Sequence, residues 1–251
     1  MRLYYGCSQW GYESWRGSIY PQNSKASEFL QYYSRRFNSV ELNSTFYNGA
    51  DPQSMLRWKN KTPEGFRFCP KVPRSISHDN LLAGTEAEMR DFLAGISMLG
   101  NRLGTVFLQL SNRFGDSDLG ALETFLSAVP EEFSFSIEPR IGIMSRKDIA
   151  DQFLEVLRET GKGIVITDSV DTKPYINNLR LTSHTAFVRF IAYGHSTDKP
   201  RIEEWFVQME KWREKGLPQA YFFLHFPSES SDAELVDYFT ELSAEFTGAY
   251  N

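Results

Sequence analysis

Residues 37–47 of this chain read FNSVELNSTFY, and this stretch decides the fold. Its centre, Ser39–Leu42, is a short run containing valine and leucine, which is typical of a buried strand. The run ends in polar side chains, because Glu41 and Asn43 lie two residues apart and therefore share one face of the strand. Asp51, followed by proline, then supplies a helix N-cap and a first helical residue. The stretch therefore predicts one βα unit whose strand ends in a carboxylate and an amide.

The same alternation of a short apolar run and an amphipathic stretch continues along the whole chain. Eight such pairs in 251 residues are typical of a (β/α)8 barrel of the TIM type. A doubly wound open sheet is the alternative, but it needs a glycine-rich phosphate turn after the first strand, and residues 6–11 (GCSQWG) do not match that pattern. No linker or shift in composition interrupts the chain, so we predict one (β/α)8 barrel domain over residues 1–251, with its site at the carboxyl ends of the strands. The predicted strands are Leu3–Gly6, Ser39–Leu42, Phe66–Lys71, Thr105–Leu110, Ser134–Glu138, Gly163–Thr167, Ala186–Phe190 and Gln219–Leu224.

Helix ends are marked by local capping chemistry. Gly161 and Gly216 follow helical stretches at the point where a left-handed C-cap is needed. The sixth helix is the weakest prediction, because Lys173 to Asn178 offers only about one turn.

Composition excludes several classes of protein. The net charge of −5 argues against a general polyanion binder, although it allows one local basic patch. Cys7 and Cys69 are the only cysteines and are far apart, so neither a disulfide scaffold nor a structural zinc site is expected. The chain enters its first strand without a signal-peptide pattern, and no apolar run approaches the roughly 18 residues of a membrane-spanning helix. We therefore expect a cytoplasmic protein that does not engage membranes.

The positions at the carboxyl ends of the predicted strands are nearly all polar. In a (β/α)8 barrel these positions and the following loops build the site. Charges on the inner faces of the strands must pair with one another or meet a ligand, because an unpaired buried charge is very costly. We expect an internal network of Glu41, Glu138 and Asp168 with Arg67, Lys71 and Arg189. The polar strand ends are Ser8, Glu41 with Asn43, Lys71, Gln109, Glu138, Asp168, Arg189 and His225.

Aromatic residues make up 15% of the chain, more than an ordinary aliphatic core requires. Several of them lie in the loops after the first two predicted strands. Trp10 and Tyr47 are candidates for an aromatic wall on which a sugar ring or nucleobase would stack, whereas Trp15 and Tyr20 are expected to pack in the core.

Several segments resemble the DUF72, or YecE-like, family of (β/α)8-barrel proteins. The most specific is residues 37–47, and the resemblance is strong to about residue 110 and thinner afterwards. It implies the barrel, and it names no activity. The other segments that carry it are residues 8–12 (SQWGY), 15–17 (WRG), 20–21 (YP), Trp58, 62–68 (TPEGFRF), Lys71, Pro73, His78, 103–110 (LGTVFLQL) and Val188 with Arg189.

The first functional hypothesis is binding or processing of a small anionic or sugar-like molecule at the barrel mouth by acid/base chemistry. Glu41, Glu138 and Asp168 are the candidate catalytic residues, because paired carboxylates serve as general acid and base. Phosphate sites recur in this fold after strands 7 and 8, so cationic side chains would hold the anion. The candidate ligand-binding residues are Ser8, Trp10, Asn43, Tyr47, Lys71, Gln109, Arg189 and His225.

Two other classes of function stay open. Aromatic residues beside lysine and arginine would also suit a nucleic-acid or phosphodiester-processing barrel resembling the endonuclease IV group. A non-catalytic interaction protein would use the same charges as an internal ion-pair network. We predict no metal or other cofactor, because the four histidines show no metal-binding spacing; three carboxylates with a histidine would be the ligand set if a divalent ion bound.

Overall fold

The computed structural model of the chain describes residues 1–169, 172, 180–226 and 232–248. A strand lies at each of the eight predicted positions, with bounds that differ from the expected ones by a few residues at most. These strand predictions are confirmed. The strands are β1 (Arg2–Cys7), β2 (Ser39–Leu42), β3 (Arg67–Pro70), β4 (Val106–Gln109), β5 (Phe135–Glu138), β6 (Gly163–Asp168), β7 (Thr185–Ile191) and β8 (Gln219–His225).

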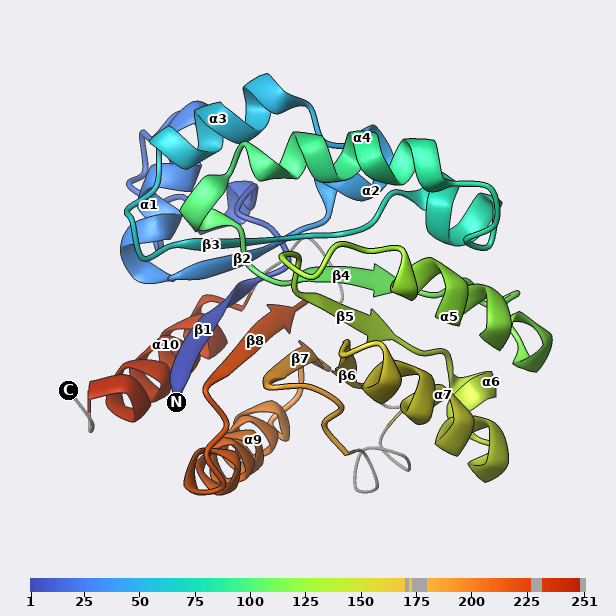
Figure 1. The fold of residues 1–251 in the computed structure, drawn as a ribbon. Coiled ribbons are helices and arrows are strands. Elements are labelled where there is room, and N and C mark those ends of the chain that lie inside the picture. The colour runs from blue at the N-terminus through green and yellow to red at the C-terminus, as the bar shows by residue number, and fades with distance from the viewer. Residues whose placement is uncertain (170–171, 173–179, 227–231, 249–251) are drawn as a thin grey trace.

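Helices alternate with the strands through most of the described chain (Figure 1). The Asp51 cap is confirmed, since its carboxylate accepts a hydrogen bond from the backbone N–H of Ser54 at 2.9 Å. Gly161 and Gly216 adopt the expected positive φ angles of 66° and 83°. The predicted sixth helix, Lys173 to Asn178, lies outside the described residues. The helices are α1 (Phe29–Arg36), α2 (Ser44–Asn48), α3 (Pro52–Asn60), α4 (Glu86–Ser97), α5 (Leu119–Ser127), α6 (Ile141–Met144), α7 (Lys147–Glu159), α9 (Asp198–Glu214) and α10 (Ala233–Gly248).

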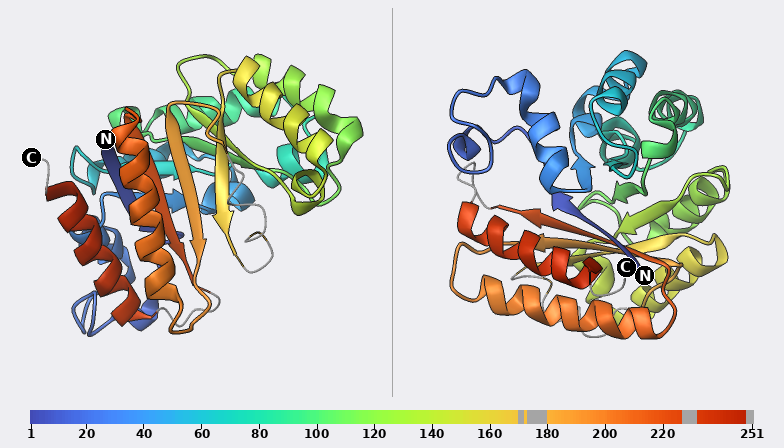
Figure 2. Two further views of the ribbon diagram at one scale, coloured as in Figure 1. Left: turned by 90° about the horizontal axis from the view of Figure 1, so that it is seen from below. Right: turned by 90° about the vertical axis from the view of Figure 1, so that its left-hand side faces the viewer.

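Six of the strands form one parallel sheet in the order β1-β8-β7-β6-β5-β4, and β2 and β3 pair with each other in a second parallel sheet. The chain therefore has an α/β fold with a mostly parallel central sheet. Figure 2 shows α9 and α10 lying side by side over the β1, β8 and β7 part of this sheet. No helix in the described part of the chain is long and apolar enough to cross a membrane.

At the β3–β4 junction the two sheets meet through isolated backbone contacts. Single parallel bridges join Phe68 to Leu103 and Lys71 to Phe107. Two backbone hydrogen bonds, from Val72 N–H to the Phe107 carbonyl at 3.0 Å and from Gly104 N–H to the Phe68 carbonyl at 2.8 Å, complete the contact. The carboxyl end of β3 is thereby held beside β4.

Between β1 and β2, hydrogen bonds from side chains to the backbone take the place of the backbone hydrogen bonds that join the strands of a sheet. The Tyr33 hydroxyl accepts from the Cys7 N–H at 2.6 Å and donates to the Ser39 carbonyl at 2.8 Å. Asn38 accepts from the Tyr5 N–H at 2.7 Å and donates to a β1 carbonyl at 3.0 Å. Gly6 permits this approach, because a Cβ there would lie 1.9 Å from the Ser39 carbonyl oxygen. The two strands are thus joined by one tyrosine and one asparagine.

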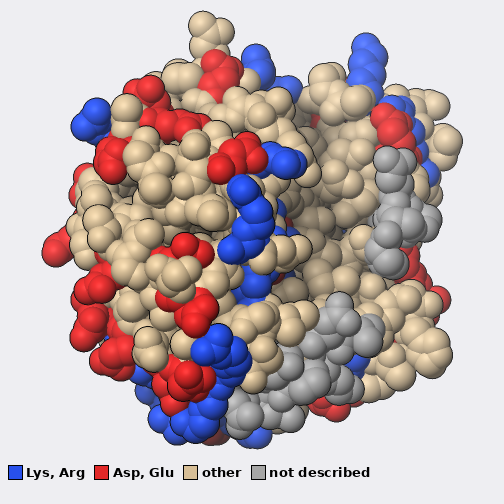
Figure 3. Space-filling view, turned by 90° about the vertical axis from the view of Figure 1, so that its right-hand side faces the viewer, with Lys and Arg blue, Asp and Glu red and all other residues tan. Residues whose placement is uncertain are grey.

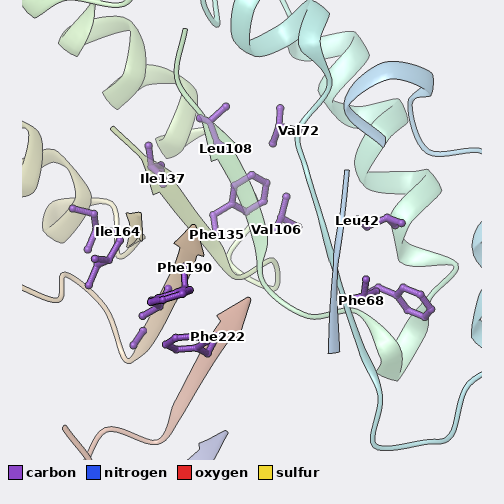
Figure 4. Close-up of a cluster of buried hydrophobic side chains, with 14 of the residues drawn as sticks. Leu42, Phe68, Val72, Val106, Leu108, Phe135, Ile137, Ile164, Phe190 and Phe222 are labelled. Carbon is purple, nitrogen blue, oxygen red and sulfur yellow. The ribbon is translucent and has the colours of Figure 1, made fainter. Parts of the chain in front are cut away.

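The buried side chains form two clusters on opposite faces of the strands. The larger lies between the strands and the helices, where Figure 4 shows residues such as Leu108, Ile137 and Phe190. The smaller cluster consists only of strand residues facing away from the helices, and most of its members are aromatic. They are Tyr4, Cys69, Phe107, Val165, Phe187, Tyr221 and Phe223. Stacked and tilted ring pairs within this cluster, such as Phe187 with Tyr221 at 5.8 Å, account for part of the aromatic surplus.

Candidate functional site

Arg189, near the end of β7, forms ion pairs with two buried carboxylates. Its Nε and Nη2 donate to the two oxygens of Glu41 at 2.9 and 3.0 Å. Its Nη1 donates to both oxygens of Glu138 at 2.8 and 2.7 Å. The three side chains come from β7, β2 and β5, and all three are buried. The predicted internal network therefore has Arg189 as its centre.

Neighbouring polar groups complete the hydrogen bonding of these carboxylates. Asn43 Nδ2 donates to Glu41 at 2.8 Å, and His225 Nε2 lies 3.0 Å from the other oxygen of the same carboxylate. On the Glu138 side, Gln109 Nε2 and the Thr167 hydroxyl each donate at 2.8 Å. Each of the four carboxylate oxygens thus has two neighbouring donors. This saturation fixes the side chains of the network in place.

Both carboxyl groups are held in the ionised form. Burial alone would raise the pKa of Glu41 and of Glu138, but the charge of Arg189 and the hydrogen bonds donated to them outweigh it and lower both pKa values. For His225, burial disfavours the protonated imidazole and lowers its pKa below the ordinary value of 6.5, so the imidazole is neutral at pH 7. The site therefore contains two fixed negative charges and one fixed positive charge at its centre.

Lys71, directly after β3, brings a second positive charge into the site. Its Nζ donates to Gln109 Oε1 at 2.9 Å and lies 4.3 Å from the centre of the Phe46 ring and 5.6 Å from that of Phe107. In the described part of the chain no carboxylate forms an ion pair with it. Burial, followed by the charge of Arg189, lowers the pKa of Lys71 to about 8.

Two residues that were not among the predicted site residues, His78 and Arg140, extend the cationic side of the site. Arg140 Nη2 lies 3.4 Å from His78 Nε2, and the His78 ring meets the Phe46 ring edge-on at 5.1 Å. Burial, together with the charges of Arg140 and Lys71, lowers the pKa of His78 to about 4, so it is neutral at pH 7. Arg140 follows Glu138 by two residues, and this spacing was the signal that would have identified it.

The structure separates Asp168 and Arg67 from this network, and the prediction that they join it is wrong. The Asp168 carboxylate pairs with Arg201 at 2.8 Å and accepts from the Trp205 indole N–H at 2.8 Å, both on α9. Its neighbour Thr167 faces Glu138, so Asp168 points to the opposite side of β6. Arg67 begins β3, and its guanidinium lies over the Tyr4 ring, away from the carboxyl ends of the strands.

The remaining predicted ligand-binding residues lie around the site in different ways. Ser8 takes part through its backbone carbonyl, which accepts from Asn43 Nδ2 at 3.1 Å. Trp10 packs edge-on against Trp58 at 5.3 Å, in the layer of the helices. Tyr47 is 74% exposed and meets Phe46 edge-on.

Trp15 and Tyr20 are buried in the core, as predicted. His195 is exposed, and its Nδ1 lies 3.3 Å from the Thr197 hydroxyl, outside the network.

Figure 3 views the molecule from the side toward which the strands run, and lysine and arginine atoms lie along a hollow near the centre of that face. Within the described residues, no group of three or more His, Cys, Asp and Glu side chains is arranged to hold a metal ion.

Comparison with known proteins identifies the family. The model of a family described as "Protein of unknown function DUF72" matches residues 4–249. The chain belongs to the DUF72 family. This DUF72 protein is 32% identical to the UPF0759 protein YecE of Escherichia coli K12, over 93% of this chain and 90% of that protein. It is 36% identical to the UPF0759 protein YunF of Bacillus subtilis over 30% of this chain and 26% of that protein.

Solved structures of DUF72 proteins have the same fold. A DUF72 family protein from Thermotoga maritima superposes with a TM-score of 0.80 at 24% identity, covering 98% of this chain and all of that one. One from Enterococcus faecalis gives a TM-score of 0.76 at 17% identity, covering 96% of this chain and 95% of that one. These likenesses extend over the strands that carry the site.

Proposed function

We propose that this protein binds a small anionic or sugar-like molecule at the carboxyl ends of its strands and processes it by acid/base chemistry. The observation that carries the proposal is the position of Lys71. Its ammonium is buried against two aromatic rings, forms one hydrogen bond to Gln109, and has no carboxylate partner in the described part of the chain. A buried cation attracts an anionic ligand strongly, because few water molecules compete for its charge and its hydrogen bonds.

The charges around Lys71 support an anion at the same place. Glu41, Glu138 and Arg189 together carry one negative charge, which Lys71 balances. Arg140 then adds a positive charge that forms no ion pair with the described residues and donates to a backbone carbonyl. An anionic group between Lys71 and Arg140 would bring the site to neutrality.

The roles of the side chains differ from those that the sequence predicts. The guanidinium of Arg189 is fully engaged with the two carboxylates, so its role is to position them and not to hold the ligand. Glu41 and Glu138 are ionised and saturated with donors, which makes them poor proton carriers at neutral pH. Lys71 is the better candidate, because a group whose pKa is near 8 exchanges protons readily close to neutral pH. Asn43 and Gln109 hold the carboxylates of Glu41 and Glu138 in place by donating hydrogen bonds to them.

We further propose that the eight strands close into a (β/α)8 barrel. Glu41 on β2 contacts both Arg189 on β7 and His225 on β8, so side chains from separate sheets meet in one interior. The bridges between β3 and β4 and the tyrosine and asparagine contacts between β1 and β2 support closure at both junctions. A closed barrel would place all the named strand ends around one mouth.

The test is a thermal-shift screen of sugar phosphates, nucleotides and small carboxylates. The screen compares the wild type with Lys71→Met, which keeps the length of the side chain and removes its charge. The matched control is Arg57→Gln, which removes an exposed cation from α3. We expect at least one compound to raise the Tm of the wild type and of the control but not that of Lys71→Met.

The proposal fails if no compound stabilises the wild type, or if Lys71→Met responds as the wild type does to every compound. Conversion of the binding compound, followed by proton NMR, then tests the chemical step. A single-stranded oligonucleotide that binds more tightly than any small compound, and more weakly as salt rises, would favour the nucleic-acid alternative instead.

A further inference from the structure

A cavity lies at the opposite ends of the strands from the candidate site. It has a volume of about 640 Å³ and is formed where β1 and β3 begin and α10 ends. Figure 2 (right) shows the start of β1 beside the C-terminal end of α10. Arg2, Arg67 and Arg213 contribute to its lining, none of the described residues that line it is acidic, and Arg213 forms an ion pair with Glu210. Arg2 and Arg67 therefore bring positive charge to this cavity in a protein whose net charge is −5.

Tyr4 brings two of these arginines to one place. Arg2 Nη1 lies 3.3 Å from the Tyr4 hydroxyl, and the Arg67 guanidinium lies 5.4 Å from the centre of the Tyr4 ring. Tyr4 is itself fixed, because it is buried and stacks on Tyr221 at a centroid distance of 4.8 Å. Two guanidinium groups thus converge on one immobile tyrosine.

The charges of these two arginines are not neutralised by carboxylates in the described part of the chain. Arg67 Nη1 donates to the backbone carbonyls of Glu64 and Phe66, and Arg2 Nη1 donates to the Tyr4 hydroxyl. Neither arginine forms an ion pair with a described residue. Like charges that converge without a carboxylate between them are stabilised by a bound anion. Paired guanidinium groups suit phosphate in particular, because their forked N–H donors match its oxygens.

We propose that this cavity binds a small molecule bearing phosphoryl groups, with Arg2 and Arg67 as its ligands and Tyr4 as the residue that positions them. The cavity volume is in the range of small-molecule sites and accommodates a group as large as a nucleotide. None of its described lining residues is a carboxylate or a histidine, and the proposal is one of binding alone. It lies at the other end of the strands from Lys71, and the proposal is therefore independent of the function proposed for that site.

Isothermal titration with inorganic pyrophosphate tests the proposal, using protein without an N-terminal tag, because a tag would adjoin Arg2. The titration is made in the Lys71→Met variant, so that binding at the other end of the strands does not contribute. We expect one equivalent of pyrophosphate to bind. Arg2→Gln and Arg67→Gln should each weaken binding more than tenfold, because each removes charge-assisted hydrogen bonds. Tyr4→Phe should weaken it several-fold, because it releases Arg2 but keeps the ring under Arg67.

The matched control is Arg57→Gln, which removes the same charge from an exposed site on α3 and should leave the affinity unchanged. Arg2 is exposed, so its substitution does not disturb the fold, and Arg2→Gln remains informative if Arg67→Gln unfolds the protein. The absence of binding to Lys71→Met, or equal affinities for Arg2→Gln and Arg57→Gln, would overturn the proposal.

Discussion

Arg189 and Glu41 are 148 residues apart in the chain and form a doubly hydrogen-bonded ion pair in the interior, at 2.9 and 3.0 Å. One residue belongs to the six-stranded sheet and the other to the two-stranded sheet. The pair therefore ties the two sheets together at the candidate site. Since Arg189 also holds Glu138, a single guanidinium organises the charged centre of the molecule.

Replacing Arg189 by methionine should strongly destabilise the protein. The change leaves Glu41 and Glu138 buried with no cation between them, and an uncompensated buried charge typically costs about 3–5 kcal/mol. Urea denaturation at pH 7 measures the loss in the free energy of unfolding. The control is Arg158→Met, which breaks an exposed pair with Glu155 and should cost less than about 1 kcal/mol. Equal costs for the two variants would show that the central pair does not support the fold.

Gly6→Ala tests the close approach of β1 and β2. A Cβ at this position would lie 1.9 Å from the Ser39 carbonyl oxygen, which is backbone and cannot move aside easily. We expect a loss of about 3 kcal/mol in the free energy of unfolding. Gly120→Ala in α5 is the control, because no atom lies within 4 Å of the added methyl group and alanine favours a helix by about 0.5–1 kcal/mol. Gly6→Ala should lower the free energy of unfolding, and Gly120→Ala should raise it. A Gly6→Ala protein as stable as the wild type would contradict the close approach of β1 to the Ser39 carbonyl.

Tyr33→Phe removes the hydroxyl that joins β1 to β2. The buried Cys7 N–H then loses its acceptor and the Ser39 carbonyl loses a donor, at a cost of about 1–3 kcal/mol. Amide hydrogen exchange at Cys7 should also become faster. Tyr32→Phe is the neighbouring control, because the Tyr32 hydroxyl forms no hydrogen bond with the described residues. Unchanged exchange at Cys7 in Tyr33→Phe would count against this junction.

His78 should make the protein less stable as the solution becomes acidic. The pKa of His78 is lowered to about 4 in the folded state from an ordinary value of 6.5, so the unfolded chain binds a proton more readily between these values. The contribution of His78 to stability is therefore complete above pH 6.5 and is lost as the pH falls toward 4. In His78→Gln the free energy of unfolding should fall less steeply over this range than it does in the wild type. Parallel curves for His78→Gln and the wild type would contradict this.

The strand positions could be predicted from sequence because each strand is a short apolar run that ends in a polar residue. The network prediction brought Glu41, Glu138 and Arg189 together correctly, and Gln109, selected as a polar strand end, lies beside them. Asp168 was misplaced because its position at the end of β6 was taken as sufficient, whereas its neighbour Thr167 faces the network and side chains alternate along a strand, so Asp168 faces α9. Arg67 shares a face of β3 with Lys71, but it lies at the start of the strand and Lys71 lies just after its end. The alternation of side chains predicts which face a residue occupies, and it does not predict which end of the strand the residue is near.

The loops were less predictable than the strands. Trp10 and Tyr47 follow the first two strands as an aromatic wall would require, yet Trp10 packs on Trp58 and Tyr47 points into solvent. The orientation of a loop side chain depends on tertiary contacts that no local pattern encodes. His78 was missed for the same reason, since its proximity to Arg140 arises from separate loops that meet at the candidate site. Arg140 did carry a local signal, which is its two-residue spacing from Glu138.

The most direct test of the proposed anion site is an NMR titration of Lys71 itself. Its side-chain signals are assigned by their absence in Lys71→Arg, and their shifts are followed from pH 6 to 11. The account predicts a midpoint near pH 8, because burial and the charge of Arg189 lower the pKa of this ammonium, and a rise of that midpoint when an anion from the screen is added. A midpoint at the ordinary value of 10.5 that does not move with the anion would contradict the account.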